Sequence, residues 1–207
     1  MLRQMIDLLL RAAVLSAAAT SPAFAHHPMD YATPATALEG LLSGLGHPVI
    51  GVDHLLFVLG AGVLVSRVDR GYMLPLIFVA ASVSVAGIRY LGVSGELGEL
   101  WVAGSLVVLG AILLATQALP GGAIAVVFLL AGALHGYALA EAIVGAERTP
   151  LVAYLIGLTV IQSAVALGAW WIAGWLAVHR PRLPLQRLAG AAVGIAGLAF
   201  AGMAAFN

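Results

Sequence analysis

The sequence contains no cysteine and no lysine, and only 9% of its 207 residues carry a charge. The absence of cysteine excludes disulfides and thiolate metal sites, so any metal ion must be held by nitrogen and oxygen atoms. All nine basic residues are arginine and the formal net charge is zero. This balance gives no electrostatic case for binding nucleic acid, which we exclude as a partner.

Hydrophobic residues make up 62% of the chain, and its mean hydropathy is +1.07. This apolar fraction is far above that of a soluble domain. The apolar runs are long and continuous, whereas the strands of a membrane β-barrel would alternate apolar and polar residues. The composition therefore predicts an all-α protein, a polytopic transmembrane bundle whose partner is the lipid bilayer.

Residues 1–25 have the features of a secretory signal peptide. Arginines flank a short apolar stretch, and Ala23 and Ala25 occupy the small-residue positions of a cleavage site. Cleavage after Ala25 would leave a mature chain that begins His26-His27, and an uncleaved anchor helix is the alternative. An export signal of this type indicates the bacterial inner membrane.

We expect residues 26–36 to form a short periplasmic tail, and residues 37–207 to form one transmembrane domain of six helices. Most of the apolar segments approach or exceed the roughly 20 residues that span a bilayer core. The six segments are residues 37–65, 72–91, 100–115, 123–144, 151–178 and 188–206.

The arginines give an independent test of orientation. A cleaved signal peptide places the mature N-terminus in the periplasm, and six spans return the C-terminus to the same side. The loops at residues 67–71 and 179–187 would then face the cytoplasm, and they carry five of the seven arginines that follow residue 25. This distribution agrees with the positive-inside rule.

The first apolar segment contains the motif H-P-V-I-G-V-D-H, from His47 to His54. Pro48 lacks an N–H group and disfavours a helical conformation at His47, and Gly51 weakens a helix. We therefore predict that the first helix is broken between His47 and Gly51. Irregular backbone at membrane depth is tolerated where it lines a cavity, and broken helices form ion sites in many transporters.

Ionisable side chains inside a membrane are costly, at about 2.5–3.5 kcal/mol each, and usually serve a function. The first segment carries His47, Asp53 and His54, and the fourth carries His135 at a similar depth. We predict that these four residues meet in one site. Imidazoles with a carboxylate and no thiolate suit Ni²⁺, Co²⁺ or Zn²⁺.

Three further residues are weaker metal candidates. Glu141 lies about 240° around an ideal helix from His135, so it joins the same site only if the helix distorts or if it stands at the entrance. His26 and His27 could bind a divalent ion at the outer face, or could be an accidental pair.

Gln162, in the fifth segment, is interpreted as an interhelical hydrogen-bonding residue rather than a ligand.

The stretch G-L-L-S-G-L-G-H-P-V-I-G-V-D-H-L-L-F, together with L-H-G-Y-A-L-A-E in the fourth segment, resembles the HupE/UreJ family over essentially the whole mature chain. The resemblance implies a six-helix membrane protein of nickel or cobalt uptake. The family's fourth-segment motif commonly reads HGxAHGxE, whereas this chain has Leu139 in place of the second histidine and Ala140 in place of the glycine. The family's motif positions fall on His47, Asp53, His54, His135 and Glu141.

We therefore expect a secondary permease that takes up Ni²⁺ or Co²⁺ and has no tightly bound cofactor. The sequence contains no phosphate-binding P-loop, so an ATP-driven pump would need a partner. It contains no HExxH motif and no evident nucleophile–base pair, so we do not expect an enzyme. The alternative is a non-transporting accessory subunit of a larger membrane complex, and a homo-oligomer is also open.

Overall fold

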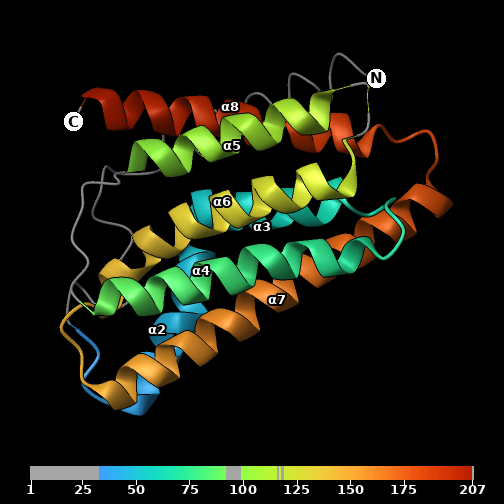
Figure 1. Ribbon diagram of the computed structural model, residues 1–207. Coiled ribbons are helices and arrows are strands. Elements are labelled where there is room, and N and C mark those ends of the chain that lie inside the picture. The colour runs from blue at the N-terminus through green and yellow to red at the C-terminus, as the bar shows by residue number, and fades with distance from the viewer. Residues whose placement is uncertain (1–32, 92–98, 116, 118, 207) are drawn as a thin grey trace.

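Figure 1 shows the computed structural model of the protein, which describes residues 33–91, 99–115, 117 and 119–206. Within these ranges the regular structure is entirely helical, with no strand, which confirms the all-α prediction. The predictions for the signal peptide and for His26 and His27 lie outside the described residues.

The helices follow the predicted apolar segments closely, and two short 3-10 helices (η1 and η2) adjoin α4 and α6. In chain order they are α2 (Ala37–Ile50), α3 (Val52–Leu64), η1 (Gly71–Met73), α4 (Leu74–Tyr90), α5 (Glu99–Leu114), α6 (Gly121–Leu139), η2 (Ala140–Ile143), α7 (Arg148–His179) and α8 (Leu185–Phe206).

Four helices of the described chain are long and apolar enough to cross a membrane: Gly71–Tyr90, Gly121–Ile143, Arg148–His179 and Leu185–Ala205. The pair α2 and α3 meets the same test only when its two members are taken together. Helix α5 is apolar but has 16 residues, fewer than a full upright span needs. The structure therefore supports four or five spans, and the count of six stays a prediction.

The first membrane helix is broken, as predicted, but the break lies at Gly51 alone. Helix α2 continues through His47 and Pro48 to Ile50, and α3 then leaves at an angle of 74°. Within the predicted stretch from His47 to Gly51, His47 itself stays helical, because the residue before proline has only a preference against the helix. Tight packing of α2 on α7 outweighs that preference: Gly44 lies directly against the backbone of Tyr154.

Helices pack in pairs, α2 on α7, α4 on α6 and α5 on α8. In Figure 1, α5 and α8 lie along one side of the bundle, α2 and α7 lie along the opposite side, and α3, α4 and α6 lie between them. Glycines allow two of these pairs to approach closely. Gly136 of α6 lies against the backbone of Ser82 in α4, and Gly110 of α5 lies against Gly194 of α8.

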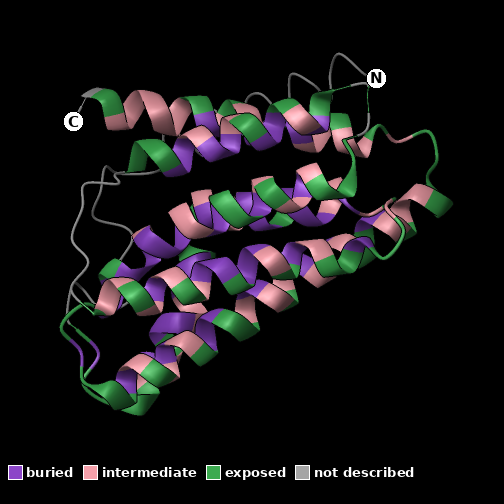
Figure 2. Cartoon of the chain, viewed as in Figure 1, coloured by how far each residue is buried: buried purple, intermediate pink, exposed green. Residues whose placement is uncertain are grey.

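Buried residues line the inner faces of the helices, and the outer faces are exposed, as Figure 2 shows. Many of the exposed residues are large and apolar, among them Leu129, Leu130, Ile156, Trp171 and Leu198. An outer surface of this kind is costly in water and is solvated by lipid chains. The chain is accordingly a multi-pass membrane protein.

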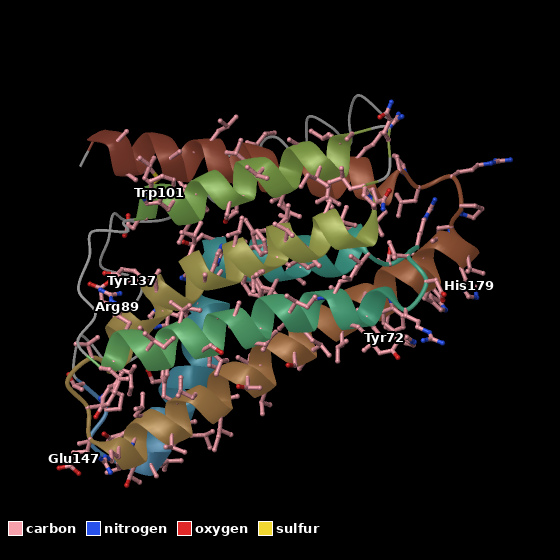
Figure 3. All side chains as sticks on the ribbon, in the orientation of Figure 1. Tyr72, Arg89, Trp101, Tyr137, Glu147 and His179 are labelled. Atoms are coloured by element: carbon pink, nitrogen blue, oxygen red, sulfur yellow. The ribbon has the colours of Figure 1, made fainter. Side chains whose placement is uncertain are left out.

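The two arginine-bearing loops lie at the same end of the bundle, where Arg67 and Arg182 line a common pocket. Arg89 and Tyr137 lie at the other end (Figure 3), where the Arg89 guanidinium stacks over the Tyr137 ring at 4.0 Å from its centroid. The same guanidinium donates a hydrogen bond to the Tyr137 carbonyl and so joins α4 to α6. The position of the two arginine-bearing loops at one end is consistent with the predicted orientation, which stays a prediction.

Glu39, at the start of α2, has a structural role. Its carboxylate accepts hydrogen bonds from the backbone N–H groups of Ala35 and Thr36, and the Thr36 hydroxyl accepts one from the Glu39 N–H. This reciprocal capping box satisfies donors that the first helical turn leaves unpaired. Glu39 therefore begins the helix and does not extend towards the histidines.

Candidate metal site

Polar side chains are rare in the interior of the described chain. The buried polar residues are Ser43, His47, His54, Ser82, Ser105, His135 and Gln162. Three of the seven are histidines, and they come from α2, α3 and α6. The hydrogen bonds and ring contacts described below connect most of this set.

His54 and His135 form the centre of the site. Their Nδ1 atoms are 2.7 Å apart, and their ring centroids are 4.9 Å apart. His47, from the last turn of α2, places its ring centroid 6.1 Å from that of His54. His135 is fully buried, and His47 and His54 are about 5% exposed or less. The prediction that the two distant segments meet at similar depth thus agrees with the structure.

Asp53 lies in the first turn of α3, immediately after the break. Its Oδ1 atom accepts a hydrogen bond of 2.8 Å from the His54 backbone N–H and lies 4.0 Å from His54 Nε2. The helix dipole favours a carboxylate at this position. The side chain is 16% exposed, so a negative charge sits at the most accessible point of the histidine cluster.

Gly51 has a steric role at the break. A Cβ atom on this residue would come within 2.8 Å of the His54 ring and 3.3 Å of Asp53 Oδ1. The backbone angles at Gly51, φ −69° and ψ 96°, are open to other residues. A side chain at this position would therefore push the His54 ring and the Asp53 carboxylate away from their present places.

Ser105, from α5, fixes the orientation of the His135 ring. The Ser105 hydroxyl donates its only hydrogen to the Val102 carbonyl, at 2.6 Å. Its contact with His135 Nε2, at 2.9 Å, must then be a bond that the histidine N–H donates. As a neutral ring, His135 is left with a lone pair on Nδ1, which faces His54. This is how an outer-shell partner orients a histidine ligand.

Aromatic rings close one side of the cluster. The Phe57 and Phe78 ring centroids lie 4.8 Å and 5.3 Å from that of His135, and the two phenylalanines stack at 4.9 Å. Phe57 lies after His54 in α3, and Phe78 lies near the start of α4. Both rings are therefore on the side of the histidines that faces the arginine-bearing loops. The histidine cluster is therefore separated from that end by a tightly packed apolar wall.

A comparison with protein families tests the resemblance drawn from the motifs. The family model described as HupE / UreJ protein matches residues 13–200. The chain belongs to the HupE/UreJ family. This assignment places it among transporter-like membrane proteins related to nickel and cobalt transport. Comparison with curated proteins and with solved structures finds no match to the chain.

Two positions of the HupE/UreJ fourth-segment motif lie apart from the histidines. Leu139 is fully buried in a second apolar cluster with Ala86, Tyr154 and Leu158, and its carbonyl accepts a 2.5 Å hydrogen bond from the Tyr154 hydroxyl. Glu141 lies beyond it in η2 and is exposed. The departure at Leu139 is therefore filled by apolar packing, and a metal-binding role for Glu141 stays a prediction.

As they lie, no three histidine, aspartate or glutamate side chains in the described ranges are arranged to hold a metal ion. The distance between the central histidines gives the reason. Two nitrogen ligands of one tetrahedral ion lie about 3.3 Å apart, whereas the two Nδ1 atoms are 2.7 Å apart and share a hydrogen. Binding a tetrahedral ion between them requires the rings to separate by about 0.6 Å, given metal–nitrogen distances of about 2.0–2.1 Å.

Sequence reasoning missed Ser105 as part of this site. Replacing Ser105 with alanine removes the acceptor that fixes the His135 tautomer, so we expect Ni²⁺ binding to weaken about tenfold, as for other outer-shell partners. Ser105→Thr keeps the hydroxyl and should restore binding. Competition with a chromophoric chelator measures the affinity, and histidine ¹⁵N NMR reports the tautomer. An unchanged His135 tautomer in Ser105→Ala would contradict this role.

Proposed function

We propose that the protein is a secondary permease that takes up Ni²⁺ or Co²⁺ through the site of His47, Asp53, His54 and His135. One observation carries the proposal: three buried imidazoles from three helices converge beside a carboxylate in the middle of an apolar bundle. Burying such groups in a membrane protein is costly, and they usually mark the path of an ion or a proton.

The composition of the site suits the proposed cargo. Imidazole nitrogen favours Ni²⁺, Co²⁺ and Zn²⁺, whereas Mg²⁺ and Ca²⁺ prefer shells of oxygen ligands. Asp53 contributes the negative charge that offsets part of the cost of removing a divalent ion from water. The ligands thus supply both selectivity and charge, and the transported ion is the substrate rather than a resident cofactor.

Exposure along the site suggests how the ion enters. Asp53 is partly exposed, His54 and His47 are nearly buried, and His135 is fully buried. An ion would meet the carboxylate first and the His54–His135 pair last. The wall formed by Phe57 and Phe78 would block further passage in this conformation. Release to the other side would then require α3 and α4 to move, with Gly51 as the hinge between α2 and α3.

The proposal includes the orientation and the location. We infer that the arginine-bearing end faces the cytoplasm of a bacterial cell, and that both mature termini are periplasmic. His26 and His27 would then lie on the side from which the ion is taken up, where they could capture it.

Transport by the purified chain alone tests the proposal. In vesicles with an enclosed metal-sensitive dye, we expect external Ni²⁺ and Co²⁺ to enter and Mg²⁺ to be excluded. The matched control is the double variant His54→Ala, His135→Ala, which should be incorporated into the vesicles in the same amount but should transport no metal. If a folded wild-type protein passes no metal, and uptake in cells requires a co-purifying partner, the chain is an accessory subunit instead.

A further inference from the structure

Gln162 of α7 is buried but incompletely hydrogen-bonded. The side chain is 1% exposed, and its Nε2 donates a hydrogen bond of 3.3 Å to Ser82 Oγ in α4. Its Oε1 atom is buried and has no hydrogen-bond partner among the described residues. The bond to Ser82 agrees with the interpretation of Gln162 as an interhelical hydrogen-bonding residue, but that role uses only half of the amide.

Turning the amide over does not remove the problem. The Ser82 hydroxyl could then donate to the oxygen, but the amide nitrogen would lose its acceptor. A buried polar atom without a partner has lost its bonds to water and gained nothing in return. A hydrophobic residue of similar length would avoid this cost while filling the same space. The amide at this position therefore calls for a partner that the described residues do not provide.

The helix contacts place Gln162 at the level of the histidine cluster. Gly44 lies against Tyr154 and Leu158, so one turn further along both helices brings Gln162 to the level of Pro48, which follows His47. Gln162 does line a narrow gap there, together with Pro48 and Leu55. On the α4 side, its partner Ser82 lies against Gly136, the neighbour of His135.

We propose that Gln162 is a specificity-determining residue of the transport site, whose amide oxygen binds the metal ion held by the histidines. The inference rests on the proposed function. The bond from Nε2 to Ser82 Oγ turns the nitrogen of the planar amide towards α4, so Oε1 points away from α4. A neutral amide oxygen adds a ligand atom to the metal site without adding charge. It favours an ion that accepts a larger coordination shell over Zn²⁺, which protein sites mostly hold with four ligands.

Two variants separate binding of the ion from packing between helices. Gln162→Met has similar length and no amide, whereas Ser82→Ala removes the partner of Nε2 but keeps the amide oxygen. We expect Gln162→Met to weaken Ni²⁺ binding by the purified protein at least about tenfold, because losing a ligand should cost no less than losing an outer-shell partner. Zn²⁺ binding should fall much less. Ser82→Ala loosens the amide but keeps its oxygen, so it should weaken Ni²⁺ binding much less than Gln162→Met does, and Gln162→Glu, which keeps an oxygen, should restore binding.

Chelator competition gives the affinities, and uptake into vesicles gives KM and the maximal rate. Equal losses of Ni²⁺ affinity in Gln162→Met and Ser82→Ala, or equal effects on Ni²⁺ and Zn²⁺, would show that Gln162 only packs helices and would overturn the inference. Failure of the proposed function has a different signature, in which the wild type binds Ni²⁺ but does not transport it. A wild type that binds no Ni²⁺ would refute both.

Discussion

Replacing Asp53 with asparagine should abolish uptake of Ni²⁺ and Co²⁺ while leaving the protein folded in the membrane. Asparagine has the same shape, and its amide oxygen can still accept the bond from the His54 backbone N–H. The variant therefore removes the charge and little else. Attraction between two unit charges 4 Å apart is worth about 4 kcal/mol in a partly polar protein environment, and a divalent ion doubles it. We expect initial uptake rates at low metal concentration to fall at least about 100-fold, since each 1.4 kcal/mol is a factor of ten.

The matched control is Asp69→Asn, in the exposed loop that precedes η1. It removes the same charge from the same chain but beyond the end of α3 that is remote from the histidines, so uptake should stay close to that of the wild type. Protein abundance in the membrane and thermal unfolding should be equal for both variants. If Asp53→Asn retained uptake within about threefold of the wild type, which is less than 1 kcal/mol, the carboxylate would not be a ligand of the transported ion.

The centre of the candidate site could be predicted from the sequence because membrane burial makes ionisable residues stand out. His47, Asp53, His54 and His135 are conspicuous in apolar segments, and the segment boundaries fix their depth. The family motifs point to the same residues.

The supporting residues could not be predicted in the same way. Serine and glutamine are common in membrane helices, and what distinguishes Ser105 and Gln162 is which helix each one faces. Ser105 acquires a role only because α3 brings α5 against the His135 layer, and Gln162 because glycines seat α2 on α7. These pairings are long-range properties, and neither composition nor periodicity along one segment contains them.

The break in the first helix shows the same limit on a local scale. The motif correctly indicated an interruption between His47 and Gly51, but the local preferences of Pro48 and Gly51 did not distinguish which end of that stretch would break. Packing of Gly44 on Tyr154 keeps α2 helical through Pro48. The chain bends at Gly51 instead, where close approach of His54 and Asp53 leaves no room for a side chain. Tertiary contacts thus choose between the two weak points that the sequence offers.

Replacing Gly136 with alanine should cause a large loss of stability. A methyl group there would overlap the Ser82 backbone carbonyl of α4. A backbone carbonyl cannot rotate away as a side chain can, so α4 and α6 would have to separate. Overpacking typically costs about 1–3 kcal/mol, and we expect the upper end of this range. For a chain of this size, that corresponds to a fall in Tm of roughly 6–12 °C, measurable by thermal unfolding in detergent.

Gly104→Ala provides a control in which the same substitution should not lower the stability of the protein. Gly104 lies within α5, and a Cβ atom there would meet no other atom within 4 Å. Alanine is the better helix former by about 0.5–1 kcal/mol, so this variant should be at least as stable as the wild type. Gly136 is adjacent to His135, and forcing α4 away would also loosen the contact between Phe78 and that ring. Gly136→Ala should therefore lose metal binding along with stability, whereas equal stability of the two alanine variants would mean that α4 and α6 are not in close contact.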